Sequence, residues 1–184
     1  MKMKKINIKD ICIIALMTAI IVVCSWMSIP MTVPVTMQTF AVFLTLLVCG
    51  GRNGAFSILI YILLGLIGVP VFSSFKGGTA ALFGLTGGYI FGFLLIAFIY
   101  FLTERFISDK TPAKVISLLL GLIVCYIFGT VWFIHLYNLG DDSITIKAAI
   151  TMCVIPFIIP DILKLLLALF VYKAAKPVLE KVKN

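Results

Sequence analysis

The sequence has few charged residues: Asp, Glu, Lys and Arg make up only 12% of its 184 residues, where soluble domains usually carry about 25%. Acidic residues are scarcest, with 7 Asp and Glu against 15 Lys and Arg, which gives a formal net charge of +8. Hydrophobic residues account for 62% of the chain, and the mean hydropathy is +1.22. This composition excludes an ordinary soluble domain and indicates an integral membrane protein.

The sequence also lacks the common signatures of catalysis and metal binding. It contains one histidine, His135, and no G-x-S-x-G, H-E-x-x-H or G-x-x-x-x-G-K-[ST] motif. Its five cysteines are odd in number, have no C-x-x-C spacing and lie in apolar segments, where cysteine behaves as a small hydrophobe. We therefore expect no catalytic residues, no metal, no cofactor, no disulfide and no ATP site in this chain. An intramembrane enzyme that uses Asp161 or His135 remains a weaker alternative.

Hydropathy predicts an all-α, multi-pass protein of the cell membrane, with residues 1–184 forming a single six-helix domain. The basic start and apolar run near the N-terminus are read as a retained first helix, because no A-x-A-like cleavage site follows them. The second and third segments are short for a bilayer, so we expect them to tilt or to end in re-entrant structure. The predicted spans are residues 11–29, 36–50, 54–70, 86–107, 113–134 and 148–172.

Local signals support the breaks between these spans. Pro30 and Pro34 cannot continue a helix, and the GGRNG stretch at residues 50–54 is typical of a tight turn. Thr111 is expected to cap the fifth span, with Pro112 as its first helical residue. Asp142 or Ser143 is expected to cap the sixth span.

The basic residues predict the orientation of the chain, because cytoplasmic loops carry the excess of Lys and Arg. If both termini are cytoplasmic, only Lys76 and Lys147 fall outside, and Lys164 lies within the membrane. The net positive charge is then explained by the orientation of the chain in the membrane, and no nucleic-acid-binding face is expected. The remaining basic residues all fall inside: Lys2, Lys4, Lys5, Lys9, Arg52, Arg105, Lys110, Lys114, Lys173, Lys176, Lys181 and Lys183.

Two charged residues interrupt the last apolar segment, in the stretch IIPDILKLLLAL at residues 158–169. Asp161 and Lys164 are three residues apart, so they share one helical face, and Lys164 is expected near the middle of the bilayer. Pro156 and Pro160 predict a break or kink just before the pair. The pair could be a salt bridge that packs the bundle, but such a bridge adds little net stability. We therefore favour a ligand site with an ammonium for an anion and a carboxylate for N–H donors.

Weaker signals lie towards the outer side. The glycine-rich stretch GGTAALFGLTGGY at residues 77–89 could form a non-helical loop close to a ligand, or an ordinary outer loop. Gln38 is a polar residue at the start of the second span, and Tyr89 and Trp132 are aromatic residues near outer helix ends, where interface anchors are common. Ala15 and Ala19 form a small-xxx-small pair that allows close approach of another helix, from this chain or from a partner.

Four stretches, taken in order, resemble the motifs of the BioY family: VPVTMQTFAVFL, YILLGLIGVPVFSS, LTGGYIFGF and PFIIPDILK. The resemblance runs from about Pro34 to Lys164. It implies the six-helix fold of a biotin-binding S component of an energy-coupling factor (ECF) transporter. Such a component captures biotin from outside and works with a membrane scaffold subunit, EcfT, and two cytosolic ATPase subunits.

The resemblance also implies roles for particular residues. The ligand-binding residues that it implies are Asp161, Lys164, Gln38, Thr86, Gly88 and Tyr89. We also expect Val35 and Thr36, which stand in the first motif, and the aromatic residue Trp132 to bind the ligand. Ala15 and Ala19 match the helix that contacts the scaffold in S components. Two positions depart from the family pattern, since Leu85 replaces the usual Pro before TGGY, and Ile159 and Pro160 replace a Pro-Gly pair before Asp161. Both departures bear on loop geometry more than on the identity of the ligand.

The residues agree with this ligand on physical grounds. Lys164 could neutralise the valerate carboxylate of biotin, Asp161 could accept its ureido N–H groups, and apolar walls suit its rings. The rival is a stand-alone, ion-coupled carrier of a small anionic vitamin, in which Asp161 titrates during transport.

Overall fold

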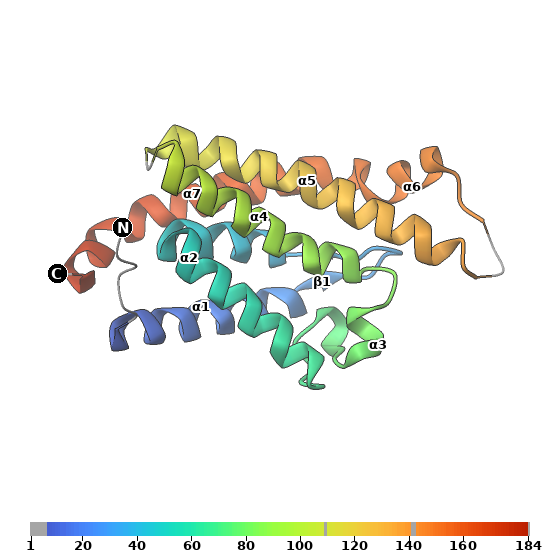
Figure 1. The fold of residues 1–184 in the computed structure, drawn as a ribbon, viewed down its shortest axis with the longest axis horizontal. Helices are drawn as coiled ribbons and strands as arrows, with labels where there is room; N and C mark the ends of the chain where they lie inside the picture. The colour runs from blue at the N-terminus through green and yellow to red at the C-terminus, as the bar shows by residue number, and fades with distance from the viewer. Residues whose placement is uncertain (1–6, 109, 141–142, 184) are drawn as a thin grey trace.

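The helices of the computed structural model lie side by side along one direction, as Figure 1 shows. Residues 7–108, 110–140 and 143–183 are described. The long helices are α1 (Ile8–Trp26), α2 (Gln38–Leu66), α4 (Gly87–Phe106), α5 (Thr111–Tyr137) and α7 (Ile155–Lys183). The short elements between them are β1 (Ser28–Ile29), β2 (Val35–Thr36), the 3₁₀ turn η1 (Ser73–Phe75), α3 (Thr79–Leu82) and α6 (Ile146–Cys153).

Helix α2 is a hairpin of two arms and not one straight rod. Gly50 has φ 78° and ψ 170°, a left-handed backbone that interrupts the helix and that glycine adopts without steric cost. The Gln38 side chain donates a hydrogen bond of 2.8 Å to the Tyr61 hydroxyl, although a straight helix would separate these residues by about 35 Å. The predicted turn in the GGRNG stretch is therefore confirmed. It separates a first arm (residues 38–49) from a second arm (residues 51–66).

The two arms explain the number of membrane crossings. Five helical stretches in the described residues are long and apolar enough to cross a membrane. Because α2 folds back on itself, they make six segments, and the six-helix prediction is confirmed. The chain is a multi-pass membrane protein. Most helical ends differ from the predicted spans by a few residues; the third predicted span reaches residue 70, whereas α2 ends at Leu66. The largest difference is at the sixth predicted span, because α7 continues to Lys183, well beyond residue 172.

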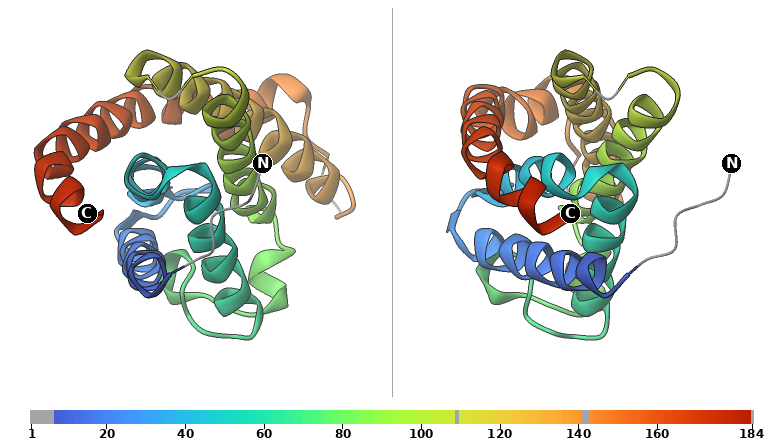
Figure 2. Two further views of the ribbon diagram at one scale, coloured as in Figure 1. Left: turned by 60° about the vertical axis from the view of Figure 1, so that its left-hand side comes forward. Right: turned by 90° about the vertical axis from the view of Figure 1, so that its left-hand side faces the viewer.

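The first arm is the centre of the bundle. Every residue from Ala41 to Val48 is buried, and Figure 2 shows this arm surrounded by the other helices. A helix that is apolar on all sides is stable when it is buried in this way. Its length of about 18 Å is short for a span, but the first arm faces protein and not lipid. Burial at the centre, which the sequence analysis did not foresee, therefore explains the shortness of the second predicted segment.

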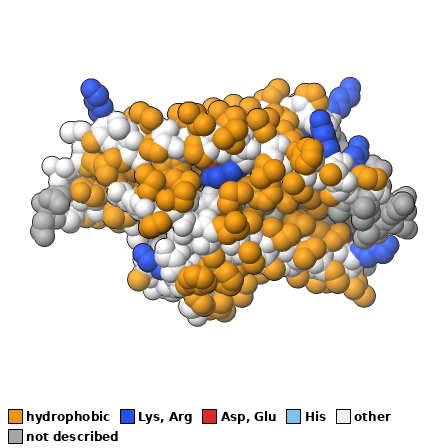
Figure 3. Space-filling model, turned by 180° about the vertical axis from the view of Figure 1, so that it is seen from behind, with side chains coloured by type: hydrophobic (Ala, Val, Ile, Leu, Met, Phe, Trp, Pro, Cys, Tyr) orange, Lys and Arg blue, Asp and Glu red, His pale blue; other side chains and the backbone are white. Residues whose placement is uncertain are grey.

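Exposed apolar side chains form the outer surface of the outer helices, as in Leu16 and Val23 of α1 and Leu166 and Phe170 of α7. Figure 3 shows this apolar surface along the length of the bundle, with basic side chains mainly towards its two ends. The start of α1, the turn between the two arms of α2, the end of α4, the start of α5 and the end of α7 all lie at one end of the molecule (Figure 1). This grouping agrees with the charge asymmetry of the sequence. The cytoplasmic placement of both termini stays a prediction.

Two predicted helix caps are wrong. Lys110, and not Thr111, is the N-cap of α5, so Thr111 is the first helical residue and Pro112 is the second. Thr145, and not Ser143, caps α6, because its hydroxyl accepts a hydrogen bond from the Ala148 N–H. The Asn138 side chain accepts a hydrogen bond from the Ile144 N–H and holds the chain outside the helix at this point. Asp142 lies outside the described residues.

The hairpin is held against α4 at a glycine, which yields a test of the fold. A Cβ atom on Gly51 would lie 2.5 Å from the Cα of Phe101, so Gly51→Ala forces α2 and α4 apart. We expect a loss of about 1–3 kcal/mol of stability, seen as a lower thermal unfolding midpoint in detergent. Gly140→Ala is the control, because its Cβ would meet only the Tyr137 carbonyl oxygen at 3.4 Å. Equal midpoints for the two variants would contradict the close approach of α2 and α4.

Candidate ligand-binding site

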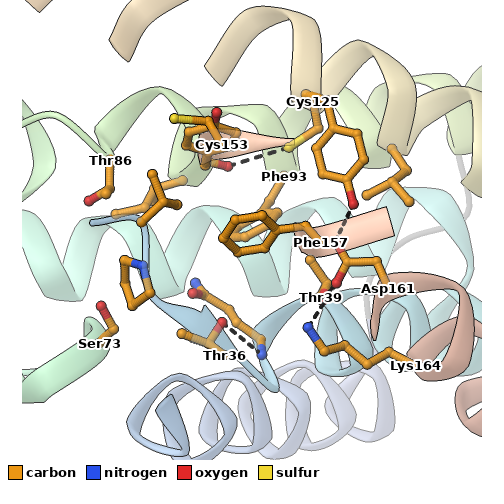
Figure 4. A pocket seen from close by; sticks show the side chains of 17 residues that line it. Thr36, Thr39, Ser73, Thr86, Phe93, Cys125, Cys153, Phe157, Asp161 and Lys164 are labelled. Carbon is orange, nitrogen blue, oxygen red and sulfur yellow. Dashed lines mark hydrogen bonds and ion pairs between the residues drawn. The ribbon is translucent and has the colours of Figure 1, made fainter. Parts of the chain in front are cut away.

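The cavity between the first arm of α2 and the loops at the end of the bundle opposite the termini brings together residues from most of the chain. It begins at the β1–β2 hairpin and η1, and it ends at α7 (Figure 4). Its lining is mainly apolar or aromatic, with polar groups at its ends. The lining residues are Val33, Pro34, Thr36, Gln38, Thr39, Ser73, Thr86, Tyr89, Ile90, Phe93, Leu122, Cys125, Tyr126, Cys153, Phe157, Asp161 and Lys164.

A break in the last helical segment places α7 against this cavity. The helix stops at Val154, whose φ and ψ are −123° and −55°, and α7 begins at Ile155. Pro156 fits this start because the first residues of a helix do not need their N–H groups. The predicted break before the charged pair is therefore confirmed. Pro160, in contrast, lies inside α7 and does not end the helix, so Asp161 and Lys164 stand in one continuous helix.

Asp161 and Lys164 form an ion pair at the inner end of the cavity. The Lys164 Nζ atom donates to Asp161 Oδ1 at 2.8 Å, and the two residues are only 7% and 1% exposed. The spacing of three residues places both side chains on one face of α7, as the sequence indicated. Each charge is costly to bury alone, and the contact neutralises both.

Two hydroxyl groups complete the surroundings of the Asp161 carboxylate. Thr39 of the first arm donates to Oδ1 at 2.8 Å, and Tyr126 of α5 donates to Oδ2 at 2.5 Å. Together with Lys164, the carboxylate accepts three hydrogen bonds from three different helices. Hydrogen bonds to an ionised acceptor are the strong ones, so this arrangement holds the side chain in one orientation.

The other end of the cavity is polar but uncharged. Ser73 and Thr86 lie at this end, opposite Asp161 and Lys164 (Figure 4). Between the two ends the walls are mainly apolar and aromatic, with Phe93 and Phe157 among them, and Thr36 adds a hydroxyl group there (Figure 4). The cavity therefore fits a ligand with a hydrogen-bonding edge at one end, a ring system in the middle and a second polar group at the other end.

Six of the nine predicted ligand-binding residues line the cavity: Thr36, Gln38, Thr86, Tyr89, Asp161 and Lys164. Val35, Gly88 and Trp132 do not. Val35 packs against an apolar cluster of Val33, Phe133, Cys153 and Phe157, three of which line the cavity, so it lies behind the cavity wall. A Cβ atom on Gly88 would lie 2.4 Å from Trp132 Cβ, so these two residues form a close contact between α4 and α5. The Trp132 indole N–H donates to the Gly84 carbonyl oxygen at 3.0 Å and fixes the loop before α4.

Sequence reasoning missed the residues that hold Asp161. Thr39 follows the predicted Gln38 directly and is part of the same motif, which was the available signal. Tyr126 stands in an apolar run of α5 with no polar neighbour, so nothing in the sequence marked it. His135 is exposed in the last turn of α5 and does not line the cavity.

The ion pair can be tested through the thermal stability of variants, without any ligand. Lys164→Met removes the ammonium and leaves a buried carboxylate without its counter-charge, so we expect a loss of about 3–5 kcal/mol. The double variant Asp161→Asn, Lys164→Met removes the charge while an amide oxygen still accepts from Thr39 or Tyr126. Thermal unfolding in detergent should show most of the stability restored in the double variant. A double variant less stable than Lys164→Met would show that the charges are not coupled.

Comparison with known proteins identifies relatives over almost the whole chain. The BioY family matches residues 1–181. The biotin transporter BioY of Thermotoga maritima is 40% identical over 153 residues, which cover 82% of this chain and 86% of that protein. The biotin transporter BioY2 of Lactococcus lactis subsp. cremoris is 38% identical over 167 residues, which cover 90% of this chain and 88% of that protein.

A solved structure has the same fold. The crystal structure of the S-component for biotin from an ECF-type ABC transporter aligns with a TM-score of 0.79 at 26% identity. The alignment covers 94% of this chain and 95% of that one. The resemblance of the sequence motifs is thus confirmed by the match along the chain and by the fold, and the chain belongs to the BioY family.

Proposed function

We propose that this chain is the biotin-binding substrate component of an ECF-type uptake transporter. Its relatives include proteins named biotin transporters, and its fold is that of an S-component for biotin. The observation that supports this function best is the buried Asp161–Lys164 pair at one end of an apolar cavity. The pair supplies hydrogen bonds to a ligand without adding net charge, and the walls suit the fused rings of biotin.

The contact between the two charged residues also bears on the orientation of biotin. The ureido and carboxylate groups lie at opposite ends of biotin, whereas Asp161 and Lys164 are 2.8 Å apart. One biotin molecule therefore cannot place its two ends on these two residues unless the pair separates. Biotin could bind with its carboxylate on Lys164 and its ureido group on Asp161 only if the Lys164–Asp161 contact opened.

A neutral ureido edge suits the intact pair better than a carboxylate. A ligand carboxylate beside Lys164 would also face the Asp161 carboxylate in a poorly solvated site, and like charges repel strongly there. The ureido group instead offers an N–H donor and a C=O acceptor side by side, which match Asp161 and Lys164 respectively. In this orientation the carboxylate of biotin points to the other end of the cavity, near Ser73 and Thr86.

Equilibrium binding to the purified chain tests both the ligand and its orientation. We expect tight binding of biotin, and a loss of about 100-fold or more in Lys164→Ala, because a hydrogen bond from a charged donor disappears and Asp161 is left unbalanced. Biotin amide, which lacks only the charge of the valerate group, should bind the wild-type chain within about tenfold of biotin, since that group faces the more polar, uncharged end.

Several outcomes would contradict this proposal. Failure of the folded wild-type chain to bind biotin would reject the function, and other small anionic vitamins would then be screened. Unchanged affinity in Lys164→Ala would reject the site. Loss of biotin amide binding with retention of biotin binding would show that the carboxylate, and not the ureido group, occupies the charged pair. The variant's folding is checked by its elution in size-exclusion chromatography.

We further propose that the exposed face of α1 contacts the membrane scaffold subunit of the transporter, which in turn couples the chain to two cytosolic ATPases. Ala15 and Ala19 are both exposed, so they do not serve packing inside this chain. A small-xxx-small pair on an exposed face lets a partner helix approach closely. The solved S-component of similar fold comes from an ECF-type ABC transporter, which supports such a partner.

Bulky side chains on this face should block assembly and spare the ligand site. We expect the variant Ala15→Trp, Ala19→Trp to lose co-purification with the scaffold and ATPase subunits and to retain the biotin affinity of the wild-type chain. The matched control is Ile116→Trp, Leu120→Trp, which places the same side chains at the same spacing on exposed positions of α5. Normal co-purification of the α1 variant would reject this interface. Uptake driven by an ion gradient in liposomes that hold only this chain would favour the stand-alone carrier.

A further inference from the structure

The Asp161 carboxylate has almost no free hydrogen-bonding capacity. A carboxylate offers about four lone-pair sites, two on each oxygen. Lys164 and Thr39 both donate to Oδ1, and Tyr126 donates to Oδ2. Oδ1 is therefore saturated, and Oδ2 retains one site for a ligand. Which site remains is decided by the donors around Asp161 and not by the aspartate alone.

The Tyr126 hydrogen bond joins parts of the chain that are otherwise held by different neighbours. Helix α5 packs mainly on α4, whereas α7 packs mainly on α2. The cavity lies between them, and Tyr126 and Asp161 both line it. The hydrogen bond from Tyr126 to Asp161 therefore links the α5 wall of the cavity to the α7 wall. Because both residues line the cavity, this hydrogen bond lies at the cavity wall.

We propose that Tyr126 is a positioning residue that fixes the orientation of Asp161, so that a single acceptor site faces the ligand beside the Lys164 ammonium. Thr39 supports the same orientation from the first arm. The arrangement selects a ligand edge with one N–H donor next to one acceptor, as in a ureido group. This inference rests on the proposed function and adds a determinant of specificity to it.

Removing the Tyr126 hydroxyl should change selectivity and not only affinity. In Tyr126→Phe the second site on Oδ2 opens and the carboxylate can rotate, so biotin loses its matched partner. We expect biotin affinity to fall about tenfold or more, the usual effect of losing a hydrogen bond to a charged group. Iminobiotin carries N–H donors where biotin has its ureido oxygen, and the freed carboxylate can accept two of them. Its affinity should therefore stay constant or rise.

The experiment measures equilibrium binding of biotin and iminobiotin to the full chain in wild-type, Tyr126→Phe and control forms. The control is Tyr137→Phe, the same substitution on the same helix, at a residue that stacks on Phe133 and does not line the cavity. The expected result is a biotin-to-iminobiotin affinity ratio that drops about tenfold or more in Tyr126→Phe and is unchanged in Tyr137→Phe. Thr39→Val should also lower this affinity ratio, whereas Thr39→Ser, which keeps the hydroxyl, should leave the ratio at its wild-type value.

The contrary results are distinct. If Tyr126→Phe weakens both ligands equally, the residue only supports the structure and the positioning role is overturned, while the proposed function stands. If the ratio and both affinities are unchanged, the role is likewise overturned. If the folded wild-type chain binds no biotin, the proposed function fails, and this inference fails with it.

Discussion

The buried carboxylate of Asp161 is the constraint on which the site depends. An ionised group in an apolar interior is tolerated only when a counter-charge and hydrogen-bond donors surround it. Here the counter-charge comes from α7 itself, and the hydroxyl donors come from the first arm of α2 and from α5. Satisfying one carboxylate therefore fixes the relative positions of three helices. The break at Val154 and the turn at Gly50 both serve this convergence, because each directs a helix towards the cavity.

The central position of the first arm explains why Asp161 and Lys164 are buried. Residues from Ala41 to Val48 are buried on all sides, so the charged pair lies beside the apolar centre of the bundle. Low local polarity strengthens the hydrogen bonds around Asp161 and makes any unpaired charge expensive. A ligand at this end must supply complementary groups, and mismatched ligands leave buried polar atoms unsatisfied. The same physical setting thus provides both affinity and selectivity.

Most of the fold could be predicted from the sequence, because its signals are local. Hydropathy located the spans, the glycines at residues 50–54 indicated the turn, and the spacing of Asp161 and Lys164 placed them on one helical face. The site was harder, since Thr39 and Tyr126 are isolated hydroxyl residues whose roles arise from contacts between distant segments. Val35 and Gly88 show the reverse case: a sequence motif marks a stretch of chain, but which of its residues face the cavity is set by packing.

A buried ion pair adds little net stability to a fold, since apolar residues of similar volume often stabilise it as well or better. In this chain the pair borders a cavity, and one acceptor site on Asp161 and the remaining N–H donors of Lys164 are left over after the internal hydrogen bonds are counted. A purely structural bridge would have no reason to leave matching groups beside an open space. The geometry is better explained by a ligand that completes the network, which makes binding the reason for keeping two charges in an apolar helix.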